Sequence, residues 1–434
     1  MKQSINVFWY RRDLRINDNT GLYHALNSGR PVLPVFIFDT DILDQLADKS
    51  DARVHFIHQT LADLKKLFHR VGSDLLVRVG SPLKVWNELI QEYQVHTLFY
   101  NHDYEPSAIH RDECINQLMQ ANGISVQTYK DQCIFEKNDI VKDDGKPYTV
   151  FTPYAKKWKL KLSLNPIQHY PSEDCMFNCI KVNEQFQEIT LATIGFQPSF
   201  LLFPSTTVAS KIISEYHKNR DYPSMNGTSK LGIHFRFGTL SIREKVTKAI
   251  GLNETYLNEL VWREFYMQIL WHFPHVVNGA FKPQYNRIEW RNNEVEFNLW
   301  KEGQTGYPIV DAGMRELLHT GFMHNRVRMI VASFLTKHLL IDWRWGEAWF
   351  AQKLLDFELS SNNGGWQWAS GSGTDAAPYF RVFNPSLQTE KFDSNFHYVQ
   401  KWVPEFNTSS YSKPIVEHAY ARKRCLEVYQ SALK

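Results

Sequence analysis

Apolar residues in the first 130 positions alternate between two spacings. Five short runs rich in β-branched and aromatic residues predict strands. Between them the apolar side chains recur every three or four residues, as in 54–68, which predicts amphipathic helices. The predicted strands are 5–10, 32–39, 75–79, 97–100 and 125–129. Strands that alternate with helices predict a doubly wound, Rossmann-like α/β domain with a parallel sheet.

The pattern changes twice along the rest of the chain. From about 132 to 204 the periodicity weakens and prolines interrupt it, among them Pro153, Pro166, Pro171, Pro198 and Pro204, which predicts a long connection with one short helix at 155–162. Beyond 205 helical spacing continues almost to the end. The predicted helices include 208–218, 240–250, 256–272, 308–320, 325–340 and 345–356. We therefore expect an α/β domain at 1–131, a linker at 132–204 and an all-α domain at 205–434.

One stretch, 357–386, fits neither a plain helix nor a strand. It reads FELSSNNGGWQWASGSGTDAAPYFRVFNPS, with paired Asn, paired Gly and two Trp. Glycines that permit close backbone approach, together with amides that supply hydrogen bonds, suit the lining of a flat aromatic cofactor. A tightly packed loop within a helical domain explains the same composition. At this stage both interpretations stay open.

The first predicted strand carries no phosphate-binding signature. Neither GxGxxG nor GxxxxGK[ST] occurs, so a standard dinucleotide or P-loop site is not supported. Instead the strand runs into Arg11, Arg12, Asp13 and Arg15, with Asp18 shortly beyond. Charged residues at the carboxyl end of a strand can face a ligand crevice, or they can pair with one another in a salt-bridged loop.

Composition narrows the class of protein. Charged residues are 22% and hydrophobic residues 43% of the chain, and no run approaches the roughly 20 apolar residues of a membrane span. The N-terminus lacks a signal-peptide pattern, so we expect a cytoplasmic protein. Five cysteines, odd in number and scattered, argue against a disulfide framework. Cys175 and Cys179 form a close pair without a second pair, so no metal site is expected.

Two further features concern binding. Aromatic residues make up 14% of the chain, with 13 Trp, so some rings can serve stacking or electron transfer as well as packing. Basic residues recur through the helical region, where they either form a phosphate-binding face or are simply solvated. A net charge of +3 does not decide between these.

Seven motifs in order resemble those of the photolyase/cryptochrome family, over nearly the whole chain. They are FWYRRDLRINDN (8–19), TSKLGIHFRFGTLS (228–241), LVWREFY (260–266), GYPIVDAGMREL (306–317), GFMHNRVRM (321–329), LIDWRWGE (340–347) and the stretch at 357–386. The resemblance is greatest to class I photolyases that repair cyclobutane pyrimidine dimers. It implies a helical domain that binds FAD in a folded shape.

The resemblance assigns two groups of cofactor contacts. Residues that match the contacts to the FAD phosphates are Tyr222, Thr228 and Ser229. The family's next serine is Gly232 here, so one side-chain donor is missing and Gly232 is left out of the set. Residues that match those around the flavin ring are Asn325, Arg328, Asp356 and Asn362, with an ion pair expected between Arg328 and Asp356.

Asn362 bears on the reaction. By resemblance it faces N5 of the flavin, where plant cryptochromes carry Asp. A neutral amide favours the anionic reduced flavin, whereas a protonatable carboxylate favours the neutral radical, so Asn indicates repair. Enzymes that act on (6-4) photoproducts carry two His one helical turn apart, and the matching residues here are Asn325 and Met329. Without that acid/base pair the (6-4) reaction is not supported.

The implied substrate is a pyrimidine dimer flipped out of DNA. Trp262 and Trp368 would pack against its two rings, beside Met329, while Glu259 and Asn325 would bond its base edges. Glu259 and Trp262 are three residues apart and share a helical face. Arg326 is the leading phosphate contact, because flipping requires a grip on the backbone.

Three further Trp match the family's photoreduction chain from the flavin to the surface: Trp366, Trp343 and Trp290. An antenna chromophore is also implied, either a folate, a deazaflavin or a second flavin, with Tyr104 and Glu105 as candidate contacts. We expect a monomer that associates with the nucleoid through DNA. The sequence leaves two alternatives: a signalling cryptochrome without repair, and a DASH-type enzyme limited to single-stranded DNA.

Overall fold

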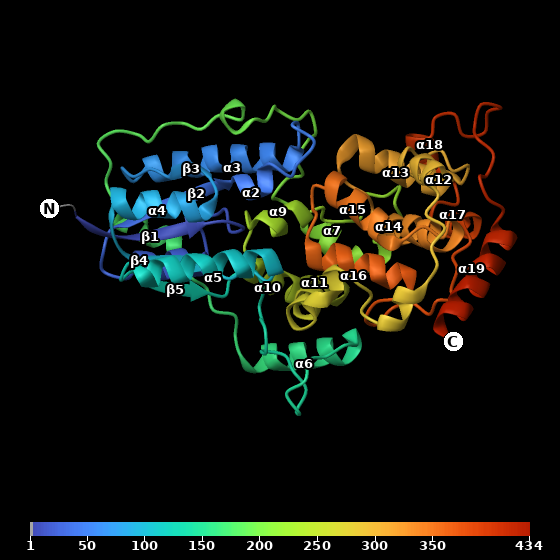
Figure 1. Ribbon diagram of the computed structural model, residues 1–434, viewed down its shortest axis with the longest axis horizontal. Helices are drawn as coiled ribbons and strands as arrows, with labels where there is room; N and C mark the ends of the chain where they lie inside the picture. The colour runs from blue at the N-terminus through green and yellow to red at the C-terminus, as the bar shows by residue number, and fades with distance from the viewer. Residues whose placement is uncertain (1–2) are drawn as a thin grey trace. The chain divides into compact units, whose positions relative to one another are not determined.

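The computed structural model describes residues 3–434, which form two compact units (Figure 1). The first, here called the sheet unit, contains the residues up to 136 together with 162–206 and 231–248. The second, the helical unit, contains 137–161, 207–230 and 249–434. The chain therefore passes between the units several times, and the segment from 132 to 204 contributes to both. Residues 231–248 pack with the sheet unit, although their position in the sequence had placed them in the helical domain.

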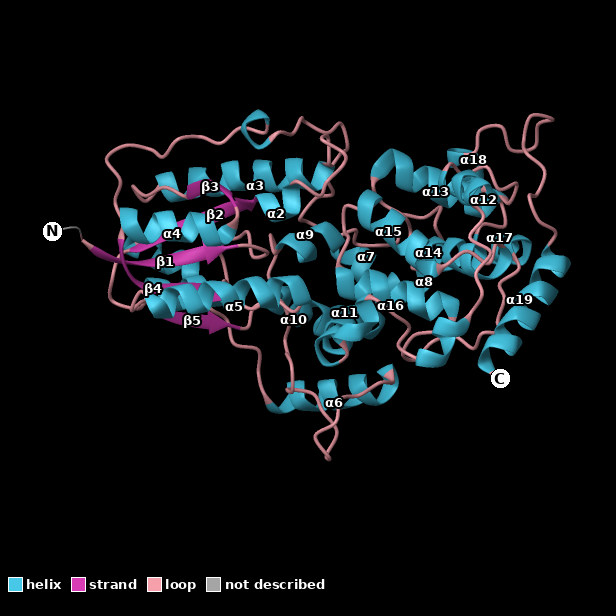
Figure 2. Cartoon of the chain, viewed as in Figure 1, coloured by secondary structure: helices cyan, strands magenta, loops and turns pink. Residues whose placement is uncertain are grey.

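The sheet unit is built on five parallel strands in the order β3-β2-β1-β4-β5 (Figure 2). Val7 in the central strand lies opposite Leu33 on one side and Leu98 on the other. The doubly wound parallel sheet predicted from the alternating pattern is confirmed. The strands are β1 (Ser4–Tyr10), β2 (Val32–Asp39), β3 (Leu76–Gly80), β4 (Gln94–Asn101) and β5 (Ser125–Tyr129).

Helices cover the sheet because its strands are apolar on both faces. Trp9 of β1 meets Trp86 edge to face at 5.5 Å, and α4 and α5 pack side by side on this face (Figure 1). The elements of the unit are α1 (Thr20–Leu26), α2 (Thr40–Leu43), α3 (Ala52–His69), α4 (Pro82–Glu92), α5 (Pro106–Ala121), η1 (Ser172–Asn178), η2 (Ala192–Ile194), α9 (Gly232–Phe237) and most of α10 (Ile242–Leu252).

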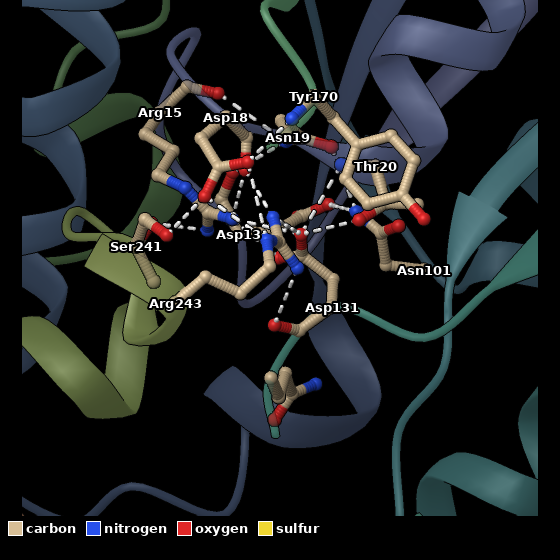
Figure 3. Close-up of polar contacts among 12 residues, drawn as sticks. Asp13, Arg15, Asp18, Asn19, Thr20, Asn101, Asp131, Tyr170, Ser241 and Arg243 are labelled. Atoms are coloured by element: carbon tan, nitrogen blue, oxygen red, sulfur yellow. Dashed lines mark hydrogen bonds and ion pairs between the residues drawn. The ribbon is translucent and has the colours of Figure 1, made fainter. Parts of the chain in front are cut away.

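The charged motif that follows β1 folds into a buried polar network (Figure 3). Asp131 accepts hydrogen bonds from Arg15 at 2.8 Å and from Arg243 at 2.9 Å. Burial raises the pKa of Asp131, but the two guanidinium groups outweigh it and hold the pKa at about 2. Asp18 accepts from Arg243, and Asn101 donates to Asp13 at 2.6 Å.

This network lies where the strand order reverses, beyond the carboxyl ends of β1 and β4. Such a crevice is the usual ligand site of a doubly wound sheet. Here the protein's own charges fill it, since Arg11 pairs with Asp112 at 2.5 Å and Arg12 with Asp103 at 3.1 Å. Of the two interpretations of the motif, the structure shows the salt-bridged loop.

The helical unit contains the remaining helices. They are α6 (Phe151–Leu164, most of it in this unit), α7 (Ser210–Ser214), α8 (Tyr216–Asn219), α11 (Glu254–His272), η3 (Pro274–Val277), η4 (Pro283–Arg287), α12 (Glu294–Lys301), α13 (Pro308–Thr320), α14 (Asn325–Ser333), η5 (Phe334–His338), α15 (Trp343–Lys353), α16 (Leu359–Ser370), α17 (Pro385–Phe392), α18 (His397–Trp402) and α19 (His418–Leu433). Across residues 3–434 no helix combines the length and the apolar character needed to cross a membrane.

Three sequence predictions for this unit were wrong in detail. The helix expected at 208–218 is two short helices, and the one expected at 325–340 ends as α14 and continues as a π-helical turn, η5. The larger correction concerns 357–386, whose first half forms helix α16. Paired Gly and Asn lower helix propensity, but tertiary packing of α16 against its neighbours overrides it.

We predict that Asp131→Asn destabilises the sheet unit by about 3 kcal/mol, because it leaves Arg15 and Arg243 buried without their shared carboxylate. Urea unfolding monitored by circular dichroism measures the loss. Asp63→Asn is the matched control, since Asp63 and Lys66 form an exposed pair with side chains 74% and 69% exposed. That control should leave the unfolding midpoint unchanged. Equal midpoints for Asp131→Asn and wild type would contradict a stabilising network.

Candidate functional site

A cavity of about 400 Å³ opens within the helical unit. Its volume lies in the range of small-molecule sites, and aromatic rings alternate with polar groups on its wall. Four helices contribute, α11, α14, α15 and α16, together with the segment between α15 and α16. The sequence-predicted residues that line it are Glu259, Trp262, Asn325, Arg328, Met329, Asp356, Asn362, Trp366 and Trp368.

Helix α11 supplies Glu259 and Trp262. The helix begins after Asn253, whose side chain accepts from the backbone N–H of Tyr256 at 3.1 Å. Arg220 donates to Glu259 at the cavity wall. Burial raises the pKa of Glu259, although the neighbouring guanidinium opposes that shift. The carboxylate is thus held in place as a hydrogen-bond acceptor that faces the cavity.

Two arginines of helix α14, Arg326 and Arg328, pair with different carboxylates. His324 caps the helix, and burial lowers its pKa to about 4, so the imidazole stays neutral and accepts from the N–H of Arg326 at 3.2 Å. Arg328 turns to the cavity and pairs with Asp356 at 2.9 and 3.1 Å, the ion pair expected from the resemblance. Arg326 is absent from the cavity wall; it pairs with Asp221 at 2.7 Å.

Helix α16 places amides on two faces. Asn363 and Gln367, four residues apart, both donate to the carbonyl of Val276 and anchor the buried side of the helix. Asn362 lines the cavity, and its amide donates to the backbone carbonyl of Glu347 at 3.1 Å. Burial raises the pKa of the Glu347 carboxyl to about 7, and its Oε1 accepts a hydrogen bond from the Asn363 amide at 3.3 Å.

The two adjacent glycines of α16, Gly364 and Gly365, have different surroundings. A side chain at Gly364 would meet the ring of Tyr266 at 2.2 Å, so glycine permits the contact between α16 and α11. Gly365 lines the cavity, and nothing lies within 4 Å of where its Cβ would stand. The first glycine therefore serves packing, while the second leaves space in the cavity wall.

The three Trp of the expected photoreduction chain share one core cluster. Trp366 and Trp343 are buried in it, and Trp290 packs against it with partial exposure. Trp366 also lies edge to face with Trp300, 6.1 Å between ring centroids. Trp300 had not been singled out from the sequence.

Several predicted residues lie away from the cavity wall. Tyr222 is 42% exposed, and Thr228 and Ser229 belong to the same irregular segment before α9, partly exposed. In the sheet unit, Tyr104 is buried and donates to Glu136 at 2.7 Å, while Glu105 accepts from Arg12 at 3.0 Å. The roles assigned to these residues by resemblance stay predictions.

Sequence reasoning also missed parts of the wall. Arg263 pairs with Glu358 at 3.0 Å, and Arg220 and Tyr266 complete the surface around Glu259. Arg263 and Tyr266 fall inside the LVWREFY motif, so the motif itself was the available signal. Among residues 3–434, no group of three or more His, Cys, Asp or Glu is arranged to hold a metal ion.

The cavity suits a flat, polar-edged heteroaromatic ring such as a flavin. An amide, a guanidinium and a carboxylate stand at its edge in Asn362, Arg328 and Asp356, and the gap at Gly365 leaves room beside them. Apolar walls come from Phe350, Leu354 and Trp366, among others. An isoalloxazine ring is oriented by polar groups at its edge and packs its faces against apolar side chains, and this cavity offers both.

Comparison with known proteins identifies the family. A family model described as DNA photolyase matches residues 6–172, and one described as the FAD binding domain of DNA photolyase matches residues 256–410. A deoxyribodipyrimidine photo-lyase of Halobacterium salinarum is 34% identical over 99% of this chain and 99% of its own. One of a Synechococcus species is 35% identical over 98% and 96%.

Solved structures agree with the sequence matches. A bacterial class III photolyase from Agrobacterium tumefaciens superposes with a TM-score of 0.87 at 31% identity, covering 100% of this chain and 98% of the other. A Sulfolobus tokodaii photolyase with two FAD molecules gives 0.84 at 33% identity, covering 99% and 100%. A Synechocystis cryptochrome gives 0.87 at 25% identity, covering 99% of each chain. Matched along both units by sequence and by structure, the chain belongs to the photolyase/cryptochrome family of FAD-binding proteins.

Proposed function

We propose that this chain is a light-driven deoxyribodipyrimidine photo-lyase that repairs cyclobutane pyrimidine dimers in DNA. The observation that supports it most is that one cavity is lined by both expected sets of residues, the flavin set and the dimer set. Its curated relatives of similar length are named as photo-lyases of this type.

The flavin set would hold FAD by its ring edge. The Arg328–Asp356 pair would present a fixed donor and acceptor, and Asn362 would offer its amide where N5 lies. FAD, when bound and reduced, supplies the excited electron that the dimer accepts and returns. The protein's part is to orient the ring, keep water from it and leave one side open to the substrate.

The dimer set would receive the flipped lesion. Trp262 and Trp368 give apolar walls for the two saturated rings, Met329 lies in the same wall, and Glu259 and Asn325 provide an acceptor and an amide for the base edges. Arg326 is not part of this wall; its guanidinium, paired with Asp221 and partly exposed, would contact the DNA backbone beside the lesion.

Electrons for reducing the flavin would come through Trp366, Trp343 and Trp290. Their order from buried to partly exposed is what a path between cavity and solvent requires. An antenna chromophore, whether a folate, a deazaflavin or a second flavin, is proposed for the sheet unit near Tyr104 and Glu105. Tyr104 and Glu105 are already hydrogen-bonded to Glu136 and Arg12, so a ligand there would bind beside these existing hydrogen bonds. A monomer that acts on the bacterial nucleoid completes the proposal.

A signalling cryptochrome is the second candidate, favoured by the structural likeness to the Synechocystis cryptochrome. Asn362 favours repair instead, since its amide cannot release a proton to the flavin. A DASH-type enzyme would share the cavity but repair only single-stranded substrate.

We predict that the reduced, FAD-loaded protein restores thymine from a thymine-dimer duplex under blue light. Chromatography of the digested DNA measures the product, with a dark sample as control. Repair of single-stranded but not of duplex substrate would point to the DASH-type alternative. Binding of the dimer with no product in either substrate would refute repair.

We predict that Asn362→Asp stabilises the neutral radical form of the flavin and leaves dimer binding largely intact. Asp at this position would face the carbonyl of Glu347, an arrangement that favours the protonated carboxyl and so a proton source. Absorption spectra during photoreduction report the change. Asn298→Asp, the same exchange on an exposed face of α12, should reproduce the wild-type spectra. Wild-type spectra from Asn362→Asp as well would remove this residue from flavin tuning.

We predict that Arg326→Ala lowers the slope of log affinity against log salt by about one, as the loss of a single phosphate contact does. Binding of damaged duplex across a salt series gives the slope. Arg315→Ala is the control, because Arg315 likewise pairs with a carboxylate, Glu405 at 2.7 Å, and lies off the cavity wall. The slope for this control should equal that of the wild type. An unchanged slope for Arg326→Ala would exclude Arg326 as a phosphate contact.

A further inference from the structure

The ring of Trp262 is stacked face to face on the ring of Phe151. Their centroids are 3.7 Å apart and the planes differ by 7°, so Phe151 packs directly on one face of the indole. The other rings approach Trp262 at an angle: Phe265 at 5.5 Å and 84°, Tyr266 at 5.5 Å and 35°. Trp262 therefore has one closely matched aromatic partner, and that partner is Phe151.

The two rings differ in their relation to the cavity. Trp262 is part of its wall, whereas Phe151 is not. Phe151 thus covers one face of the indole and itself contributes no surface to the cavity. A ring held on one face keeps a fixed plane, and a fixed plane lowers the conformational entropy lost when a flat ligand packs against it.

Phe151 is itself held by its backbone. Its N–H donates to the carboxylate of Asp375 at 3.0 Å, and the hydroxyl of Thr374 donates to the carbonyl of Thr149. Asp375 has a left-handed backbone, with φ of 46°. Residues Thr374 and Asp375 of the loop after α16 thus hold the start of α6 in place.

Two contacts fix the rest of α6 on α11. Trp158 donates its indole N–H to Glu264 at 2.5 Å, and the ring of Tyr154 lies 5.2 Å from that of Phe265. The start of α6 is therefore anchored at several points besides the stack on Trp262, and the partners at those points, Asp375, Thr374, Glu264 and Phe265, are not part of the cavity wall. The contacts of Phe151 are with Trp262, Phe265 and Asp375, which lie outside the flavin set.

We propose that Phe151 is a positioning residue for the lesion: it fixes the plane of Trp262, so that the cavity offers a rigid aromatic wall to a pyrimidine dimer. The inference rests on the proposed repair function and deepens it. Phe151 acts through Trp262, because it does not line the cavity that would hold the cofactor and the dimer. Its loss should therefore weaken recognition of the dimer and spare binding of undamaged DNA and reduction of the flavin.

The test compares Phe151→Leu, which keeps apolar bulk and loses the ring, with Phe151→Tyr, which keeps the ring. Binding of thymine-dimer duplex and of undamaged duplex is measured on the FAD-loaded proteins, with FAD content, rate of flavin photoreduction and unfolding temperature recorded for each. Phe273→Leu is the matched control, a half-buried ring that contacts Phe281 edge to face at 5.1 Å and lies off the cavity wall.

We expect Phe151→Leu to bind the dimer about threefold to tenfold more weakly, the value of one aromatic pair. Undamaged duplex, FAD content and photoreduction should not change, and Phe151→Tyr should bind as wild type does. If Phe151→Leu lowers the unfolding temperature, Phe151→Met, of similar volume, replaces it and must show the same selective loss.

Two failures are distinguishable. Wild-type protein that neither binds nor repairs the dimer refutes the proposed function, and the inference falls with it. Wild-type protein that repairs the dimer, while the leucine and methionine variants bind it equally well, refutes the role of Phe151 alone. An equal loss for damaged and undamaged duplex also overturns it, because that result indicates a general disturbance of the DNA surface.

Discussion

The close approach of α16 to α11 is the contact on which the cavity depends. It is possible because residue 364 is glycine, where any Cβ would meet the ring of Tyr266 at 2.2 Å. On its far side α16 is secured by Asn363 and Gln367, whose amides reach the backbone carbonyl of Val276. Buried amides that satisfy buried carbonyls leave little freedom of rotation. The helix is thereby fixed both in depth and in angle.

With α16 fixed, its remaining residues have defined directions. Asn362, Trp366 and Trp368 all reach the cavity wall, where they meet Trp262 from α11 and Arg328 from α14. Electron transfer between a flavin and a dimer requires that both lie close together. A cavity whose wall combines the two expected sets of residues would place them so.

Much of the fold could be predicted from the sequence because its signals are local. Runs such as 32–39 and 125–129 carry their strand character in their own residues, and the order of elements then determines a parallel sheet. Helix α16 could not be predicted in this way. Its glycines and amides oppose a helix in isolation, and the reason they form one, the ring of Tyr266, lies almost a hundred residues away in the sequence.

The residues of the site also differ in whether a local sequence signal or a long-range contact reveals them. Motif resemblance found Trp262 and Asn362, since these residues lie within quoted motifs, and Glu259, which directly precedes the LVWREFY motif. It missed the contact of Arg220 with Glu259 and the raised pKa of the Glu347 carboxyl, which arise from a partner on another element and from burial. The stack of Phe151 on Trp262 joins residues more than a hundred positions apart, and no spacing rule connects them. Charge pairing inside the loop after β1 was open from sequence and needed the structure to decide it.

The central claim, that cofactor and lesion share one cavity, can be tested by the fluorescence lifetime of the reduced flavin bound to the protein. Electron transfer to a neighbouring dimer competes with emission and shortens the lifetime. The account predicts a shorter lifetime when thymine-dimer duplex is added at saturation and no change with undamaged duplex of the same sequence. A lifetime that stays the same while the dimer is demonstrably bound would mean that the two sites are separate, and would contradict the account.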